Sequence, residues 1–183
     1  MNFISNPMEA SYNPITAADV AIYYISKDRE LKYFKRGRYY GISAGPIEGN
    51  VKLNRLLHIT QNIYLAKTGY ALFGDTFKAY EDGPVIDFIS RNYSMLVAKA
   101  RDEDTSAYFD SDIRGFLDQV FDIFKYASIE DLCALSREDS AWEKAVEKPK
   151  SIIRTLDFIE DYKIQYFSII EIIAERQVAL ADA

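Results

Sequence analysis

Residues 50–69 read NVKLNRLLHITQNIYLAKTG, and this stretch decides the fold class. Its apolar residues recur at the spacing of one helical face: Leu53, Leu56, Leu57 and Tyr64. Asn50 is a residue type that caps helix N-termini, and Gly69 is one that ends helices in the left-handed conformation. The stretch therefore predicts a helix from residue 50 to residue 69 with one buried face.

Three further segments show helical signals. A hydroxyl residue followed three positions later by an aspartate is typical of a capping box, and this pattern starts predicted helices at 16–27 and 128–135. Ser111 opens the clearest amphipathic helix, whose predicted buried face is Ile113, Phe116, Leu117, Val120, Phe121 and Phe124. The sequence predicts a mainly α fold built from a compact helical domain.

The segment after Gly69 breaks the helical pattern. We expect a small extended or β-hairpin element near residues 70–80, followed by a turn at residues 82–84. Pro84 suits the first turn of a helix, so a further helix is predicted from there to about Ala100.

The ends of the chain differ from its middle. Residues 1–15 carry two prolines and few periodic apolar positions, so they are expected to form an irregular arm before a compact domain at 16–148. Residues 149–183 are expected to form a long helical extension, which could also pair two copies as a homodimer. Its heptad positions are Ile152, Leu156, Ile159, Tyr166, Ile170 and Ile173.

Composition restricts the possible partners. The chain has 22 basic and 28 acidic residues and a net charge of -6, which argues against binding to nucleic acid or to an anionic membrane. It lacks a basic and apolar leader, and charges interrupt every apolar run before membrane-spanning length. We therefore expect a cytoplasmic protein with no nucleic-acid and no membrane partner.

The residue types that usually carry catalysis are scarce. His58 is the only histidine and Cys133 the only cysteine, so neither has a second soft ligand with which to bind a metal ion. The glycines of the segment 37–49 do not match a phosphate-binding spacing. We expect no catalytic residues, no metal and no cofactor, and predict that the protein is not an enzyme.

The segment Lys32–Tyr40 alternates basic and aromatic residues, and it is called the basic-aromatic loop below. Such a loop can stack on bases, hold an acidic protein surface, or simply be solvated. The acidic charge of the whole chain favours an acidic protein surface over nucleic acid. The predicted partner-binding residues lie in this loop and in the C-terminal extension: Lys35, Arg36, Tyr39, Tyr40, Tyr162, Tyr166 and Ile169.

Three stretches together resemble the SocA-like antitoxin family, also called the Panacea domain and related to phage-associated proteins. They are Ala18–Ala21, the run from Lys52 to Val85, and Leu135–Trp142, and the resemblance extends over residues 17–146. Departures from the family pattern occur at His58, Tyr80 and Arg137. The signature residues, which we interpret as structural, are Leu53, Leu56, Leu57, Gln61, Tyr64, Phe73, Gly83, Pro84 and Trp142.

The resemblance implies a binding protein. Its expected function is neutralisation of a cognate toxin protein by direct binding. The alternative is an adaptor, or a phage-encoded interaction protein, that delivers a partner to a protease. In either case, the part that selects the partner would be expected outside the shared core.

Overall fold

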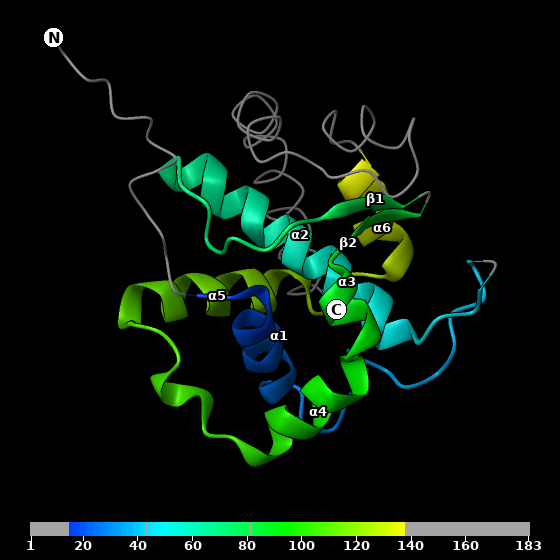
Figure 1. The fold of residues 1–183 in the computed structure, drawn as a ribbon, viewed down its shortest axis with the longest axis horizontal. Coiled ribbons are helices and arrows are strands. Elements are labelled where there is room, and N and C mark those ends of the chain that lie inside the picture. Colours follow the sequence, from blue (N-terminus) through cyan, green and yellow to red (C-terminus); the bar gives the residue numbers. More distant parts are fainter. Residues whose placement is uncertain (1–14, 43, 81, 138–183) are drawn as a thin grey trace, which may run out of the picture.

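The computed structural model describes residues 15–42, 44–80 and 82–137. This part of the chain is mainly helical with one antiparallel hairpin, as predicted (Figure 1). Its elements are α1 (Ala17–Ser26), α2 (Glu48–Thr68), β1 (Lys78–Tyr80), β2 (Gly83–Val85), α3 (Asp87–Arg91), α4 (Tyr93–Asp102), the 3-10 helix η1 (Thr105–Ala107), α5 (Ser111–Phe124) and α6 (Ile129–Arg137). Trp142 and the predicted extension at 149–183 lie outside the described residues, as do residues 1–14.

Local signals set the ends of several helices. Thr16 and Asp19 form the predicted capping box of α1, in which each side chain accepts the other residue's backbone N–H. The N–H of Asp131 donates to the Ser128 hydroxyl at 3.1 Å, so α6 begins as predicted. Gly69 ends α2 at a φ of 78°, in the left-handed conformation that a glycine adopts without strain.

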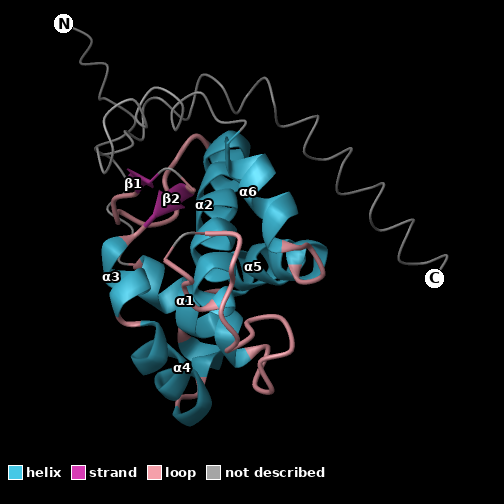
Figure 2. Ribbon diagram, turned by 90° about the vertical axis from the view of Figure 1, so that its right-hand side faces the viewer, coloured by secondary structure: helices cyan, strands magenta, loops and turns pink. Residues whose placement is uncertain are grey.

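Helix α2 lies in the middle of the domain and packs against both the hairpin and α6, which also contact each other (Figure 2). Every residue from 49 to 63 is buried, so this helix has no solvent-facing stripe. Two of its polar side chains bond to segments that are not helical. Gln61 accepts the N–H of Leu72 at 2.8 Å and donates to the carbonyl of Phe73 at 2.8 Å, while Asn54 accepts the N–H of Ile86 at 3.0 Å.

Arg55 explains the glycine of the hairpin turn. Its buried guanidinium donates to the carbonyl oxygens of Pro84 and Asp82. Gly83, between these two residues, has a φ of 124°, and a Cβ there would lie 2.7 Å from the Arg55 guanidinium carbon. Glycine is therefore required at position 83 both by backbone conformation and by the packing of Arg55.

Several predicted boundaries need correction. Helix α2 begins at Glu48, two residues before the cap predicted at Asn50, whose side-chain amide instead donates to the carbonyl of Ser90. The hairpin occupies the C-terminal end of the predicted extended element, and residues 70–77 form no strand. The prediction that Pro84 opens a helix is wrong because Pro84 pairs with Ala79 in the hairpin. The helix predicted there is two helices, α3 and α4, which meet at Asn92.

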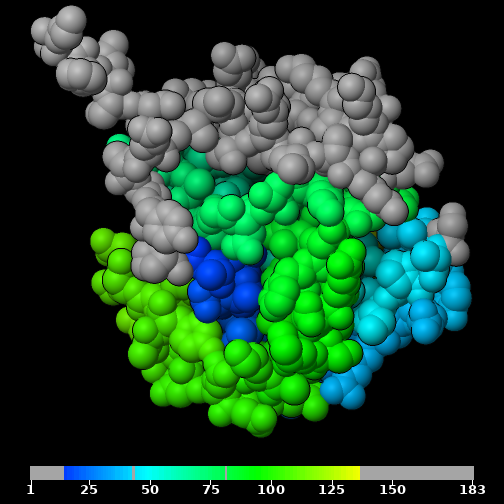
Figure 3. All heavy atoms as spheres, in the orientation of Figure 1, coloured from blue at the N-terminus to red at the C-terminus, as the bar shows by residue number. Residues whose placement is uncertain are grey.

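One main core unites these elements. Helix α1 is buried along most of its length and packs against α2, α4 and α5. On the face shown in Figure 3, α1 (blue) is visible only as a narrow strip between α5 and α4. The predicted face of α5 is buried at Phe116, Leu117, Val120, Phe121 and Phe124, with Ile113 half-buried.

Candidate functional site

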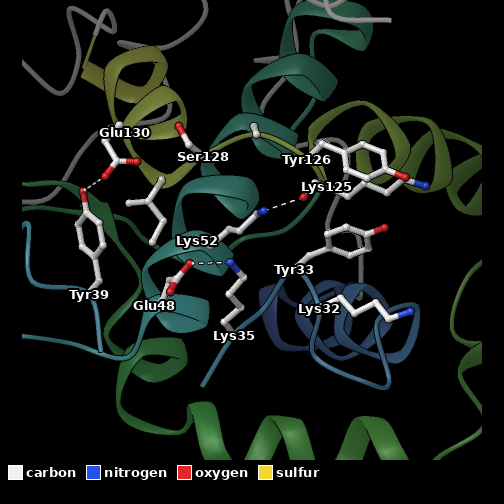
Figure 4. A pocket seen from close by; sticks show the side chains of 12 residues that line it. Lys32, Tyr33, Lys35, Tyr39, Glu48, Lys52, Lys125, Tyr126, Ser128 and Glu130 are labelled. Carbon is white, nitrogen blue, oxygen red and sulfur yellow. Dashed lines mark hydrogen bonds and ion pairs between the residues drawn. The ribbon is translucent and has the colours of Figure 1, made fainter. Parts of the chain in front are cut away.

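A pocket of about 410 Å³ lies beside the N-terminal half of α2 (Figure 4). Three segments form its walls: the basic-aromatic loop, α2 at Glu48 and Lys52, and residues 125–130, which comprise the connection between α5 and α6 and the start of α6. These segments are far apart in the sequence. The pocket therefore exists only when the helical domain has folded.

Asp28 holds the start of the basic-aromatic loop. Its carboxylate is buried and accepts the backbone N–H groups of Lys32, Tyr33 and Phe34, each at 2.8 Å. Leu31, just before them, has a φ of 53°, which is uncommon for a residue other than glycine. The three hydrogen bonds to one carboxylate stabilise this tight bend.

The N-terminus of α2 holds the middle of the loop. No side chain caps this helix; the N–H of Glu48 donates to the carbonyl of Gly37 and that of Gly49 to the carbonyl of Lys35, both at 2.8 Å. These are N–H groups that a helix leaves without intrahelical partners. The close approach requires a glycine, because a Cβ on Gly49 would lie 2.6 Å from the carbonyl carbon of Phe34.

The end of the loop is bound to α6. The Tyr39 hydroxyl donates to the Glu130 carboxylate at 2.7 Å, and this hydrogen bond holds the pKa of Glu130 below its usual value. Tyr39 also packs against a small apolar cluster of Val51, Ile129 and Cys133. Cys133 is a buried free cysteine within this cluster.

Lys52 is the most unusual side chain of the pocket. Its residue is 7% exposed, and its ammonium donates to the carbonyl of Lys125 at 2.6 Å, beyond the last residue of α5. The ammonium also lies 5.8 Å from the centre of the Tyr33 ring. Burial lowers the pKa of Lys52 to about 8, because the charged form loses its hydration.

We expect Lys52 to make stability depend on pH. The folded protein releases this proton near pH 8, whereas the unfolded chain keeps it up to the ordinary lysine pKa of 10.5. The unfolded state binds more protons between these values, so the free energy of unfolding should rise with pH there. Across this window, the free energy of unfolding of the native chain should rise by about 2 kcal/mol relative to that of a Lys52→Met variant. This rise is smaller than the full pKa shift would give, because solvent screens Lys52 on the pocket side.

Urea denaturation of both proteins at several pH values checks this expectation. The difference between the two proteins removes the contribution of groups that titrate in both, such as the tyrosines. A difference that stays constant from pH 8 to 10.5 would show that the pKa of Lys52 is not lowered.

The predicted partner-binding residues fall into three groups. Lys35 and Tyr39 line the pocket, and Lys35 lies 3.8 Å from the carboxylate of Glu48. Arg36 and Tyr40 are exposed outside it, Tyr40 by 83%. The third group, Tyr162, Tyr166 and Ile169, lies outside the described residues. Lys52 was missed as a site residue because the carbonyl to which it bonds, that of Lys125, lies 73 positions away in the sequence.

Other candidate residues are placed in the core. His58 is buried, its ring meets that of Phe77 edge-on at 5.1 Å, and its Nε2 lies 3.2 Å from the side-chain nitrogen of Asn62. Within residues 15–42, 44–80 and 82–137, no group of three histidines, cysteines or carboxylates could hold a metal ion. No helix in these ranges is long and apolar enough to cross a membrane.

Comparison with known proteins finds a family match for this helical arrangement. Residues 53–143 match the family described as antitoxin SocA-like, Panacea domain. Residues 53–143 of the chain carry the SocA-like (Panacea) domain. The match is shorter than the predicted 17–146, because it begins inside α2 and leaves α1 out. No curated protein and no solved structure matches the chain.

The Panacea signature residues lie mainly in the core of the domain. Tyr64 is half-buried, and Trp142 lies outside the described residues. The remaining signature residues are buried: Leu53, Leu56, Leu57, Gln61, Phe73, Gly83 and Pro84. The basic-aromatic loop lies before the matched residues, whereas the 125–130 wall of the pocket lies within them.

Proposed function

We propose that this chain is an antitoxin-like protein that neutralises a cognate toxin by direct binding, and that the basic-aromatic loop is a contact surface. The match to the Panacea family is the observation that carries the first part. The second part rests on the position of the loop, which lies outside the matched residues and extends to one edge of the molecule (Figure 1). A variable segment attached to a shared core can select a partner without changing the fold.

The anchoring of the loop supports this assignment. Asp28 holds its start, the N-terminus of α2 its middle, and Glu130 its end. Tyr40 and Arg36 are nevertheless exposed, and tyrosine and arginine are the residue types that most often dominate binding energy. A loop with fixed ends and exposed anchors loses little conformational entropy on binding.

The C-terminal extension is a second part of the proposal. Tyr166 belongs to its heptad positions and Tyr162 and Ile169 do not, and all three are candidate contacts for the same toxin. The pattern could equally serve pairing of two copies of the chain, so substitutions at these three positions should be scored both for toxin binding and for oligomeric mass.

A growth-rescue assay with the toxic product of an adjacent gene tests the proposal. Tyr40→Ala should weaken toxin binding at least tenfold and abolish rescue, because an exposed tyrosine anchor is removed. Its free energy of unfolding should stay within about 0.5 kcal/mol of the native value. Tyr70→Ala is the matched control, because Tyr70 is also exposed, by 41%, but lies just beyond the other end of α2.

Three outcomes would redirect this proposal. If the adjacent gene product is harmless with or without this chain, the antitoxin function fails. If the toxin disappears only when this chain and a host protease are both present, the chain acts as an adaptor rather than as a stoichiometric inhibitor. Full rescue by Tyr40→Ala would remove the loop from the contact surface.

A further inference from the structure

The lysines that line the pocket differ in whether a carboxylate lies within ion-pair distance. Three of its four lysines have a carboxylate within ion-pair distance: Lys32 with Glu30 at 3.1 Å, Lys35 with Glu48 at 3.8 Å, and Lys125 with Asp122 at 2.9 Å. Lys52 has none among the described residues, although it is the most buried of the four. A buried ammonium without a carboxylate is costly, so its position calls for an explanation beyond stability.

Hydrogen bonding leaves Lys52 with unused donors. An ammonium group has three N–H donors, and within the described part of the chain only the carbonyl of Lys125 accepts one of them. Lys52 lines the cavity, and Figure 4 shows its side chain among those of the pocket, with its ammonium directed toward Lys125. The remaining donors are therefore available to a group that enters the cavity.

We infer that this pocket binds one carboxylate of the partner protein, and that Lys52 is its counter-ion. This inference rests on the proposed function. It names the chemical group of the toxin that the basic-aromatic loop and its neighbours would hold. The carboxylate can be an acidic side chain or a C-terminus, because both present the same two oxygens to an ammonium. The pocket volume of about 410 Å³ accommodates a side chain together with part of its backbone.

The walls favour a carboxylate over a phosphate. Glu48 and Glu130 also line the pocket, and their charges would repel a doubly charged anion more strongly than a singly charged one. Ala127 and Ile129 provide apolar surface, which strengthens a single ion pair by displacing water. One unpaired ammonium beside two carboxylates matches a ligand with one negative charge.

NMR titration of the chain of residues 1–183, with its lysines isotopically labelled, tests this inference without the toxin. The Lys52 signal is assigned by its absence from a Lys52→Met variant. The side-chain probe is N-acetyl-glutamate N-methylamide, and the C-terminal probe is N-acetyl-alanine. The neutral N-acetyl-glutamine N-methylamide and inorganic phosphate are the comparison ligands, and all four are titrated well below the pKa of Lys52.

The expected result is a saturable shift of the Lys52 signal with at least one carboxylate probe. Whichever of the two binds more tightly identifies the source of the carboxylate. Lys52→Met should weaken binding at least tenfold, as followed on the loop signals, whereas Lys67→Met should leave it unchanged. Lys67 is a suitable control because it is an exposed lysine on the same helix and does not line the pocket.

Three results of this titration would overturn the inference. They are an equal response to the glutamine probe, equal or tighter binding of phosphate, and failure of Lys52→Met to weaken the carboxylate probe. Failure of the proposed function has a different signature, since rescue of toxicity would be absent for the native chain itself. If the native chain rescues growth and Lys52→Met rescues equally well, the antitoxin function stands and the carboxylate site does not.

Discussion

A Gly49→Ala variant should lose about 4 kcal/mol of stability, a large part of the 5–15 kcal/mol of an ordinary domain. A Cβ at position 49 would lie 2.6 Å and 2.7 Å from the carbonyl carbon and oxygen of Phe34, and 2.2 Å from the Tyr93 hydroxyl oxygen. The Tyr93 ring can move, but the Phe34 backbone is held by Asp28. The loop must therefore separate from α2, with strain and with loss of the hydrogen bonds from Glu48 and Gly49.

The matched control is Gly115→Ala. Gly115 is an exposed residue inside α5, and a Cβ there would meet nothing within 4 Å. This variant should be more stable by about 0.5–1 kcal/mol, because alanine favours the helix. Thermal and urea unfolding measure both changes. If Gly49→Ala unfolds like the native protein, the close approach of the loop to α2 is wrong.

The features that could be predicted from the sequence depend on neighbouring residues. The capping boxes of α1 and α6, the end of α2 at Gly69, and the buried face of α5 each arise within a few residues of chain. The start of α2 could not be predicted in this way. Its first N–H groups donate to carbonyls of the loop before it, so Asn50 was mistaken for the cap. Pro84 was assigned to a helix for a similar reason, since its carbonyl accepts from Arg55, 29 positions earlier.

The candidate site shows the same limit. The basic-aromatic loop is visible in the sequence because its charges and rings are contiguous. The pocket behind it is not, because Lys52 bonds to a carbonyl 73 positions away and Tyr39 to a carboxylate 91 positions away. Nor does the sequence distinguish Asp28 from any other aspartate. Its role as the anchor of the loop is apparent only from the three N–H groups that converge on it.

Substitution of Asp28 by asparagine should test that anchor with little change in shape. One carboxylate oxygen accepts from Lys32, and the other accepts from Tyr33 and Phe34. An amide nitrogen in place of either carboxylate oxygen would face an N–H donor, so at least one hydrogen bond is lost. The remaining hydrogen bonds are no longer made to a charged acceptor. We expect a loss of about 3 kcal/mol in the free energy of unfolding, because buried charge-assisted hydrogen bonds are the strong ones.

The same variant should change the pocket as well as the stability. Asp28 supports the charge of Lys52, so its neutralisation should lower the pKa of Lys52 further below its ordinary value. Hydrogen exchange at the amides of residues 32–34 should become faster, and toxin binding should weaken, because the loop is no longer held in its bound shape.

Asp102→Asn provides the control for Asp28→Asn. It removes the same charge from an exposed position at the end of α4, so its stability should stay within about 0.5 kcal/mol of the native value. Should Asp28→Asn bind toxin as tightly as the control while its amides exchange faster, the shape of the loop would not determine recognition. The exposed side chains of Arg36 and Tyr40 would then act independently of the anchor. Loss of both protection and binding would instead tie recognition to the single carboxylate that organises the loop.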